Sequence, residues 1–189
     1  IKNIIMSDLI PLFVDLDGTV IKEDIGQLAL KKHISNNFFN IIGILFRFLM
    51  FGKPNVKFHV SKDYNINFDE IHFNQSCLDF IETAKKSDRK VYLISGSHEL
   101  AIKKITDKLN IFDGVYGTTK NYNMISLNKV KFIHQNLGIL KFDYIGNSHQ
   151  DLPVWEYSEN VIYTNVDEGL LKKINLINKN KIFIKPIFI

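Results

Sequence analysis

The sequence predicts an α/β fold built on a parallel sheet. Short apolar runs rich in β-favouring residues alternate with amphipathic stretches of roughly 3.6-residue spacing, an alternation typical of strands joined by crossover helices. Polar residues follow several of these runs at their carboxyl ends, where open parallel sheets bind ligands. We expect strands at residues 10–14, 91–94, 114–116, 142–145 and 161–163, with helices around 101–109, 130–137 and 170–177.

A long interval separates the first two expected strands. Residues 15–90 exceed an ordinary crossover connection, so we expect an additional helical segment there. The chain has 189 residues and 46% hydrophobic content, which suits one core and leaves little room for two full domains. We therefore assign residues 1–24 and 75–189 to an α/β core and residues 25–74 to a small helical cap over the sheet.

Composition excludes several classes of protein. The single cysteine, Cys77, allows no intrachain disulfide and belongs to an apolar helical stripe, which favours a buried position and a reducing, cytoplasmic location. The net charge of +4 and the pI near 9.0 come from lysines spread along the chain among 20 acidic residues. No aromatic-rich basic cluster accompanies them, so we expect no binding of nucleic acid.

The most apolar stretch is residues 38–51. It is shorter than the roughly 20 residues of a membrane span and lies too far along the chain for a signal peptide. A packed cap helix is the preferred interpretation. Contact with a membrane surface or a prenyl substrate stays open, including a peripheral position at the inner face of the membrane. The first residue is Ile1, which leaves open whether the chain is a fragment of a longer protein.

Two carboxylates directly follow the first expected strand. Asp15 and Asp17 stand one residue apart in Asp15-Leu16-Asp17-Gly18-Thr19, beside a glycine that lets the backbone approach a phosphate. Oxygen ligands placed close together are what Mg²⁺ prefers in proteins. The pattern therefore predicts a magnesium and phosphate site at the end of this strand.

This run resembles the first motif of the haloacid dehalogenase (HAD) superfamily, and three later segments resemble its other motifs in order. The second motif is a hydrophobic strand that ends at Ser95, followed by Gly96 and Ser97. The resemblance implies that Ser95 and Thr19 bind the phosphoryl group. It also implies that Gly96 and Ser97 offer donors at a helix N-terminus near Ser97.

The third family motif is a lysine that offsets the charge of the nucleophile and the phosphate. Lys129 stands nine residues before Gly138, a spacing similar to that of relatives, and is the preferred choice. Lys131 remains open as the alternative.

The fourth family motif, usually Gly-Asp-x-x-x-Asp, reads Gly146-Asn147-Ser148-His149-Gln150-Asp151 here. The metal ligands implied by the resemblance are then Asp15, Asp17 through its backbone carbonyl, Asn147 and Asp151. An amide at position 147 removes one negative charge, which should weaken metal binding. Residues 142–155 look like the HAD-like domains fused to UbiA-type prenyltransferases, a group that also shows the Gly-Asn-Ser variant.

Together the four motifs imply a three-layer, Rossmann-like HAD core and a magnesium-dependent phosphatase for a small-molecule phosphomonoester. Asp15 would attack phosphorus, Asp17 would protonate the leaving alcohol and then activate water, and Lys129 would offset charge. The alternative is a catalytically weak or inactive phosphate-binding or regulatory module associated with a membrane prenyltransferase system. Asn147 is its only support in the sequence. Neither the natural substrate nor the oligomeric state has a readable signature.

Overall fold

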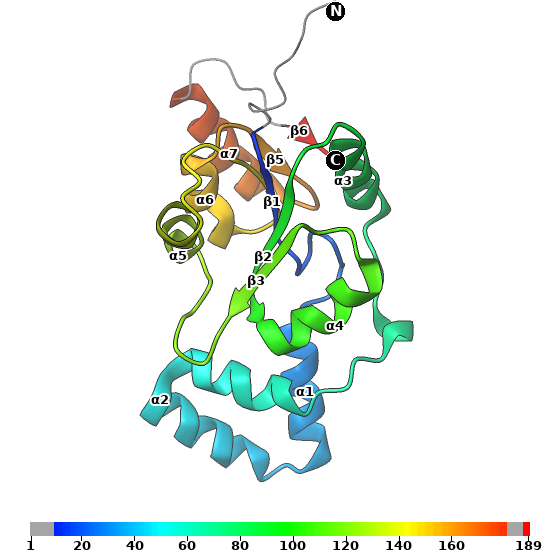
Figure 1. The fold of residues 1–189 in the computed structure, drawn as a ribbon. Coiled ribbons are helices and arrows are strands. Elements are labelled where there is room, and N and C mark those ends of the chain that lie inside the picture. Colours follow the sequence, from blue (N-terminus) through cyan, green and yellow to red (C-terminus); the bar gives the residue numbers. More distant parts are fainter. Residues whose placement is uncertain (1–9, 181–186) are drawn as a thin grey trace, which may run out of the picture.

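The computed structural model describes residues 10–180 and 187–189, and it confirms the predicted α/β fold (Figure 1). A parallel sheet lies at the centre, with the strand order β3-β2-β1-β4-β5-β6. All five expected strands form, and β6 extends the sheet at one edge. The strands are β1 (Leu12–Val14), β2 (Val91–His98), β3 (Gly114–Thr118), β4 (Asp143–Gly146), β5 (Val161–Tyr163) and β6 (Ile187–Phe188).

Helices cover both faces of the sheet, which gives the three layers seen in Figure 1. Strand β1 supplies both cores, because successive strand side chains point to opposite faces. Leu12 and Val14 pack against one helical layer and Phe13 against the other, all fully buried. The first layer is α3 (Gln75–Lys86) and α4 (Glu99–Leu109); the second is α5 (Leu127–Lys131) with the π-helical turn Phe132–Asn136, α6 (Leu152–Tyr157) and α7 (Glu168–Asn180).

The interval between β1 and β2 holds the helices α1 (Ile25–Asn36) and α2 (Asn40–Lys62) and the short 3-10 turn Phe68–Glu70. These helices stand beyond the carboxyl ends of the strands (Figure 1) and share a small core around Ala29, Val60 and Tyr64. Backbone bonds tie the two connections together where the insertion leaves and rejoins the core. The Lys22 amide donates to the His72 carbonyl, and the Asn74 amide to the Val20 carbonyl, each at 2.9 Å.

Helix α2 consists of two halves. Gly52 has φ 75° and ψ 179°, a conformation that interrupts the helix and favours glycine. Pro54 follows in the first turn of the second half, a position that tolerates its missing N–H. Residues 40–51 form the layer of the insertion farthest from the sheet, and residues 53–62 run back toward the core (Figure 1).

The structure corrects the expectation that residues 38–51 are packed. Phe38 is 75% exposed, Phe39 73% and Leu49 71%, and Ile44 is the member of this stretch that packs against the small core of the insertion. No helix in residues 10–180 or 187–189 combines the length and the apolar character that crossing a bilayer requires. Cys77 is buried, as predicted. Residues 1–9 and 181–186, which the predicted core includes, lie outside the described residues.

Candidate active site

A cavity of about 580 Å³ opens between the carboxyl edge of the sheet and the helical insertion. The loop after β1 contributes Asp15, Asp17 and Gly18, and the end of β2 contributes Gly96 and Ser97. Side chains of α1 and α2 close the opposite side. The predicted residues Lys129, Asn147 and Asp151 also line it, so segments far apart in the sequence meet at one place.

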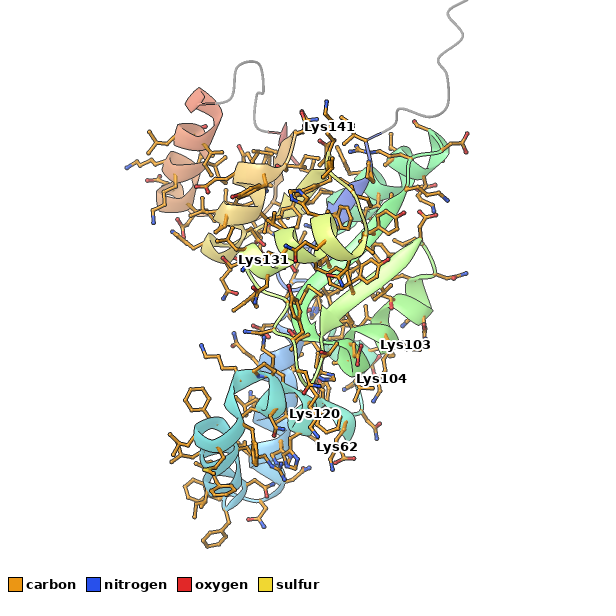
Figure 2. All side chains as sticks on the ribbon, turned by 60° about the vertical axis from the view of Figure 1, so that its left-hand side comes forward. Lys62, Lys103, Lys104, Lys120, Lys131 and Lys141 are labelled. Atoms are coloured by element: carbon orange, nitrogen blue, oxygen red, sulfur yellow. The ribbon has the colours of Figure 1, made fainter. Side chains whose placement is uncertain are left out.

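A buried charge network forms the floor of the cavity. The Lys129 Nζ atom lies 2.9 Å from Asp15 Oδ1 and 3.3 Å from Asp151 Oδ1. The Tyr144 hydroxyl donates to Asp151 Oδ1 at 2.6 Å and lies 2.6 Å from Lys129 Nζ. Lys129 is 3% exposed, whereas Lys131 projects from the surface of the core (Figure 2). The geometry therefore brings Lys129, and not Lys131, to Asp15.

Burial and neighbouring charge set the protonation of this network. Burial raises the pKa of Asp15 to about 7, although the nearby Lys129 ammonium works in the opposite direction. Burial would lower the pKa of Lys129, but Asp15 and Asp151 outweigh it and raise that pKa. Burial would raise the pKa of Asp151, but Lys129 and the hydrogen bonds to Asp151 lower it. The network therefore holds one firm ion pair, Lys129 with Asp151, beside a carboxyl group that titrates near neutrality.

The Asp151 carboxylate has little capacity left for a metal. Its Oδ2 atom accepts hydrogen bonds from the Asn147 amide at 3.1 Å and from the amide and the hydroxyl of Ser148 at 3.0 Å each. Its Oδ1 atom faces Tyr144 and Lys129, and the residue is 1% exposed. A Cβ atom at Gly146 would stand 2.7 Å from this carboxylate, so glycine leaves room for it. Asp151 was expected as a metal ligand, yet its surroundings suit a group that positions Lys129 and the loop after β4.

Asn147 lies against the loop that follows β1. The Thr19 hydroxyl donates to Asn147 Oδ1 at 3.2 Å, and Thr19 is fully buried. Gly18 has φ 73°, and a Cβ atom there would stand 2.0 Å from Asn147 Nδ2. The glycine of the first motif is thus what allows this close approach. The structure places the Thr19 hydroxyl on Asn147, whereas the sequence suggested a phosphate contact.

Asp17 is held from three directions. Its Oδ2 atom accepts hydrogen bonds from the hydroxyls of Ser97 at 2.7 Å and Ser95 at 3.2 Å. Its Oδ1 atom accepts one from the Ile25 amide at 2.8 Å, at the start of α1. Burial raises the pKa of Asp17, opposed by the hydrogen bonds from the two serines and Ile25 and increased further by nearby Asp24. The carboxyl group therefore links the core to the first helix of the insertion.

The end of β2 differs in detail from the sequence expectation. The strand continues to His98, and α4 begins at Glu99, two residues later than predicted. The pairing of β2 with β3 is irregular between Ile94 and His98, and it resumes where His98 pairs with Thr118. The Ser95 hydroxyl accepts from the Ser97 amide at 3.0 Å. The side chains of Ser95 and Ser97 thus both engage Asp17, while Gly96 and Ser97 line the cavity.

Two contributors escaped the sequence analysis. Tyr144 lies inside an apolar strand, where its hydroxyl gives no local signal. Lys57 comes from the second half of α2, and its Nζ atom donates to the Gly96 carbonyl at 2.7 Å and to Asn123 Oδ1 at 2.9 Å. Burial lowers the pKa of Lys57, partly offset by Asp17 and Asp24. A lysine four residues after Lys53 on one helix was the signal that could have drawn attention to it.

The cavity floor offers a cation oxygen donors. Within the described ranges, no group of three or more His, Cys, Asp or Glu side chains is arranged to hold a metal ion. A metal would therefore depend on Asp15 together with neutral oxygens, such as the Asn147 amide and the backbone carbonyl of Asp17. Mg²⁺ fits such a set because it keeps several waters and needs only one or two carboxylates. The residues fit magnesium, with less negative charge than two or three carboxylates would give.

Comparison of the sequence with known proteins finds an uncharacterized relative. No family model matches this chain. A curated relative, the uncharacterized protein y4nM of Sinorhizobium fredii, is 28% identical over 156 residues, which cover 81% of this chain and 29% of the relative. The chain thus spans less than a third of the length of that relative.

Solved structures with the same fold include hydrolases of the HAD family and phosphoserine phosphatases. A phosphoserine phosphatase, solved as an analogue of its phospho-aspartyl intermediate, has a TM-score of 0.58 and 15% identity and covers 96% of this chain and 94% of its own. The HAD family hydrolase t0658 of Salmonella enterica serovar Typhi has a TM-score of 0.58 and 15% identity, with 87% and 66% covered. These likenesses establish the Rossmann-like fold predicted from the sequence.

Proposed function

We propose that this chain is a magnesium-dependent phosphomonoesterase with Asp15 as its nucleophile. The observation that carries the proposal is the position of the Asp15 carboxylate, at the end of β1 on the cavity floor, with the Lys129 ammonium 2.9 Å away. A carboxyl group and an ammonium held side by side in a cavity of this kind suit attack on a phosphate. The fold shared with a phosphatase solved as a phospho-aspartyl intermediate analogue supports the same chemistry.

Asp15 and Asp17 divide the work. One carboxylate oxygen of Asp15 bonds to phosphorus while the bond from phosphorus to the alcohol oxygen breaks, which leaves an aspartyl-phosphate. Asp17, whose pKa is raised by burial, gives its proton to that alcohol. It then accepts a proton from the water that attacks the aspartyl-phosphate, and inorganic phosphate leaves as Asp15 is restored.

Lys129 offsets the charge that gathers on the phosphoryl oxygens. Tyr144 and Asp151 hold its ammonium in place, so little reorganisation is needed when a phosphate arrives. A bound Mg²⁺, held by Asp15, Asn147 and the backbone carbonyl of Asp17, would supply further positive charge to the same oxygens. The amides of the Gly96 and Ser97 segment are our candidates for the remaining phosphate contacts.

We further propose residues 25–74 as a cap and residues 1–24 and 75–189 as the catalytic core. The backbone bonds between residues 20–22 and 72–74 support these boundaries, because they close the insertion at its base. The insertion brings Phe48, Lys53 and Lys57 to the cavity, so it would contribute to the choice of substrate.

Hydrolysis of a generic aryl phosphate by the full chain, with and without Mg²⁺, tests the nucleophile. We expect turnover that requires Mg²⁺ and falls by about three orders of magnitude or more in Asp15→Asn. Asp63→Asn, the same change at an exposed position at the end of α2, is the matched control and should keep full activity. Turnover without magnesium, or turnover that survives Asp15→Asn, contradicts the proposal.

A catalytically weak or inactive phosphate-binding module is the second candidate, and Asn147 is the observation that favours it. We predict that Asn147→Asp lowers the Mg²⁺ concentration for half-maximal turnover by about tenfold, because a carboxylate binds the ion more strongly than an amide. A metal titration of both variants measures this. An unchanged titration would place Asn147 outside the coordination sphere.

The proposed association with a membrane prenyltransferase rests on the sequence resemblance, and the proposed cytoplasmic location rests on composition.

A further inference from the structure

The exposed surface of residues 38–51 is unusually apolar, and we call these residues the docking segment. At 100° per residue, the exposed apolar positions of its helix, residues 40–51, cover more than half of the helix circumference. Isolated exposed apolar side chains are ordinary, but a continuous surface of this kind marks contact with another apolar phase. The exposed apolar members are Phe38, Phe39, Ile41, Ile42, Leu45, Phe46, Leu49, Met50, Phe51 and Phe48, the last of which also lines the cavity.

Charge in the same region has one sign. Residues 25–62, which contain α1 and α2, hold six of the 24 basic side chains and none of the 20 acidic ones. The basic residues are little denser here than in the rest of the chain, so the distinguishing feature of residues 25–62 is the lack of acidic side chains. Arg47 lies within the docking segment itself, and Lys31 and Lys32 are exposed on α1, where they line a second pocket that Glu70 also borders. Asp63, the first acidic residue after α2, pairs with Lys62.

We infer that the docking segment binds the protein to a lipid surface that carries anionic headgroups. Helices that combine apolar side chains with cations and contain no carboxylates, as α1 and α2 do, have the composition of helices that lie in the interface of anionic bilayers. A second copy of the chain fits less well. Docking through the same surface would bring together two copies of residues 25–62, each with six cations and no acidic side chain, and one helix face would cover only part of the apolar circumference.

The dimensions agree with an interfacial position. A helix of residues 40–51 is about 18 Å long at 1.5 Å per residue, and the hydrocarbon core of a bilayer is about 30 Å thick. The segment therefore lies within one leaflet. Its place at the end of the molecule farthest from the sheet (Figure 1) lets it enter the lipid while the core stays in water.

Sedimentation of the full chain with vesicles tests this inference. We expect the chain to bind vesicles of phosphatidylcholine and phosphatidylglycerol at least several-fold more tightly than vesicles of phosphatidylcholine alone. High salt should weaken the binding to the anionic vesicles, because it screens the charge contribution.

Matched variants separate the two contributions. Phe46→Ser with Leu49→Ser should weaken binding to vesicles by about tenfold or more. The control is Leu140→Ser with Leu176→Ser, which changes two apolar residues on the surface of the α/β domain and should leave binding unchanged. Lys31→Glu with Lys32→Glu should weaken binding to anionic vesicles about tenfold. Lys172→Glu with Lys173→Glu, an exposed pair on α7, is the charge control and should have little effect.

Three results would overturn the inference. They are an absence of vesicle binding by the natural chain, equal losses in the docking and control variants, and a concentration-dependent dimer that Phe46→Ser with Leu49→Ser abolishes without any lipid binding. The test is independent of catalysis. Asp15→Asn should bind vesicles as the natural chain does, so a failure of the proposed phosphatase activity and a failure of lipid docking are distinguishable.

Discussion

The cavity floor and the docking segment differ in how far their side chains are satisfied within the chain. On the floor, Lys129 has three partners and Asp151 accepts five contacts, so nearly every polar atom is paired inside the chain. In the docking segment, large apolar side chains lie in solvent. The polar groups of the floor therefore find their partners within the folded chain. The apolar side chains of the docking segment would be buried only by contact with something outside the chain. Changes in the first should cost stability, and changes in the second should cost association.

Lys129→Met should have the largest effect on stability. The change removes the cation between two buried carboxylates, and breaking a buried ion pair in this way costs about 3–5 kcal/mol of unfolding free energy. Denaturant unfolding measures it. Lys131→Met, two residues away and exposed, should change the free energy by less than about 0.5 kcal/mol. Similar values for the two variants would show that the network is not a structural unit.

The pH dependence of stability should show that the ionised form of Asp15 destabilises the folded chain. Its pKa rises from 3.8 to about 7 on folding, so the folded chain binds this proton more tightly than the unfolded chain. The stabilisation is fully present below pH 3.8 and is lost as the pH rises through about 7. When a chelator removes metal ions, the free energy of unfolding of the natural chain should therefore fall by up to about 1.4 kcal/mol per pH unit relative to that of Asp15→Asn. This fall is expected between pH 3.8 and about 7.

Unfolding of the natural chain and Asp15→Asn at several pH values checks this expectation. Asp15→Asn should become the more stable protein at neutral pH and above, although we expect it to be inactive. Parallel pH profiles for the two proteins would mean that Asp15 keeps an ordinary pKa in the folded chain.

Phe46→Ser with Leu49→Ser should have the smallest effect on stability. Both side chains are mostly exposed, so their removal should change the free energy of unfolding by less than about 0.5 kcal/mol. Leu93→Ala, a fully buried position on β2, should cost about 2–5 kcal/mol in the same assay. A large loss from the double serine variant would show that the docking segment is packed in solution.

Local signals in the sequence were sufficient for the sheet. The five expected strands form because each is a short apolar run between turn signals, and the insertion is where the long interval predicted it. The Asp15 and Asp17 pattern also predicts its own position at the end of β1. By contrast, spacing alone left Lys129 and Lys131 open as alternatives, and burial at the floor separates them.

Contacts between distant segments were beyond the sequence analysis. Lys57 reaches Gly96 across 39 positions of the chain, and Tyr144 meets Lys129 only after β4 packs beside α5. Hydropathy could not decide whether residues 38–51 are packed, because it records how apolar a segment is and not what covers it. The sequence also could not predict the hydrogen bonds of Asp151. An aspartate that binds a metal and one that accepts hydrogen bonds from neighbouring residues are the same residue type.

The break at Gly52 divides α2 into two halves with different surroundings. On one side of it lie the exposed residues 40–51; on the other, Lys57 anchors residues 53–62 to the Gly96 carbonyl. Because helical backbone geometry is interrupted between the two halves, the outer half can change its tilt without pulling on that anchor. Phe48 of the outer half also lines the cavity, so a change in that tilt would alter the shape of the cavity above the carboxylates while Lys57 stays bonded to Gly96.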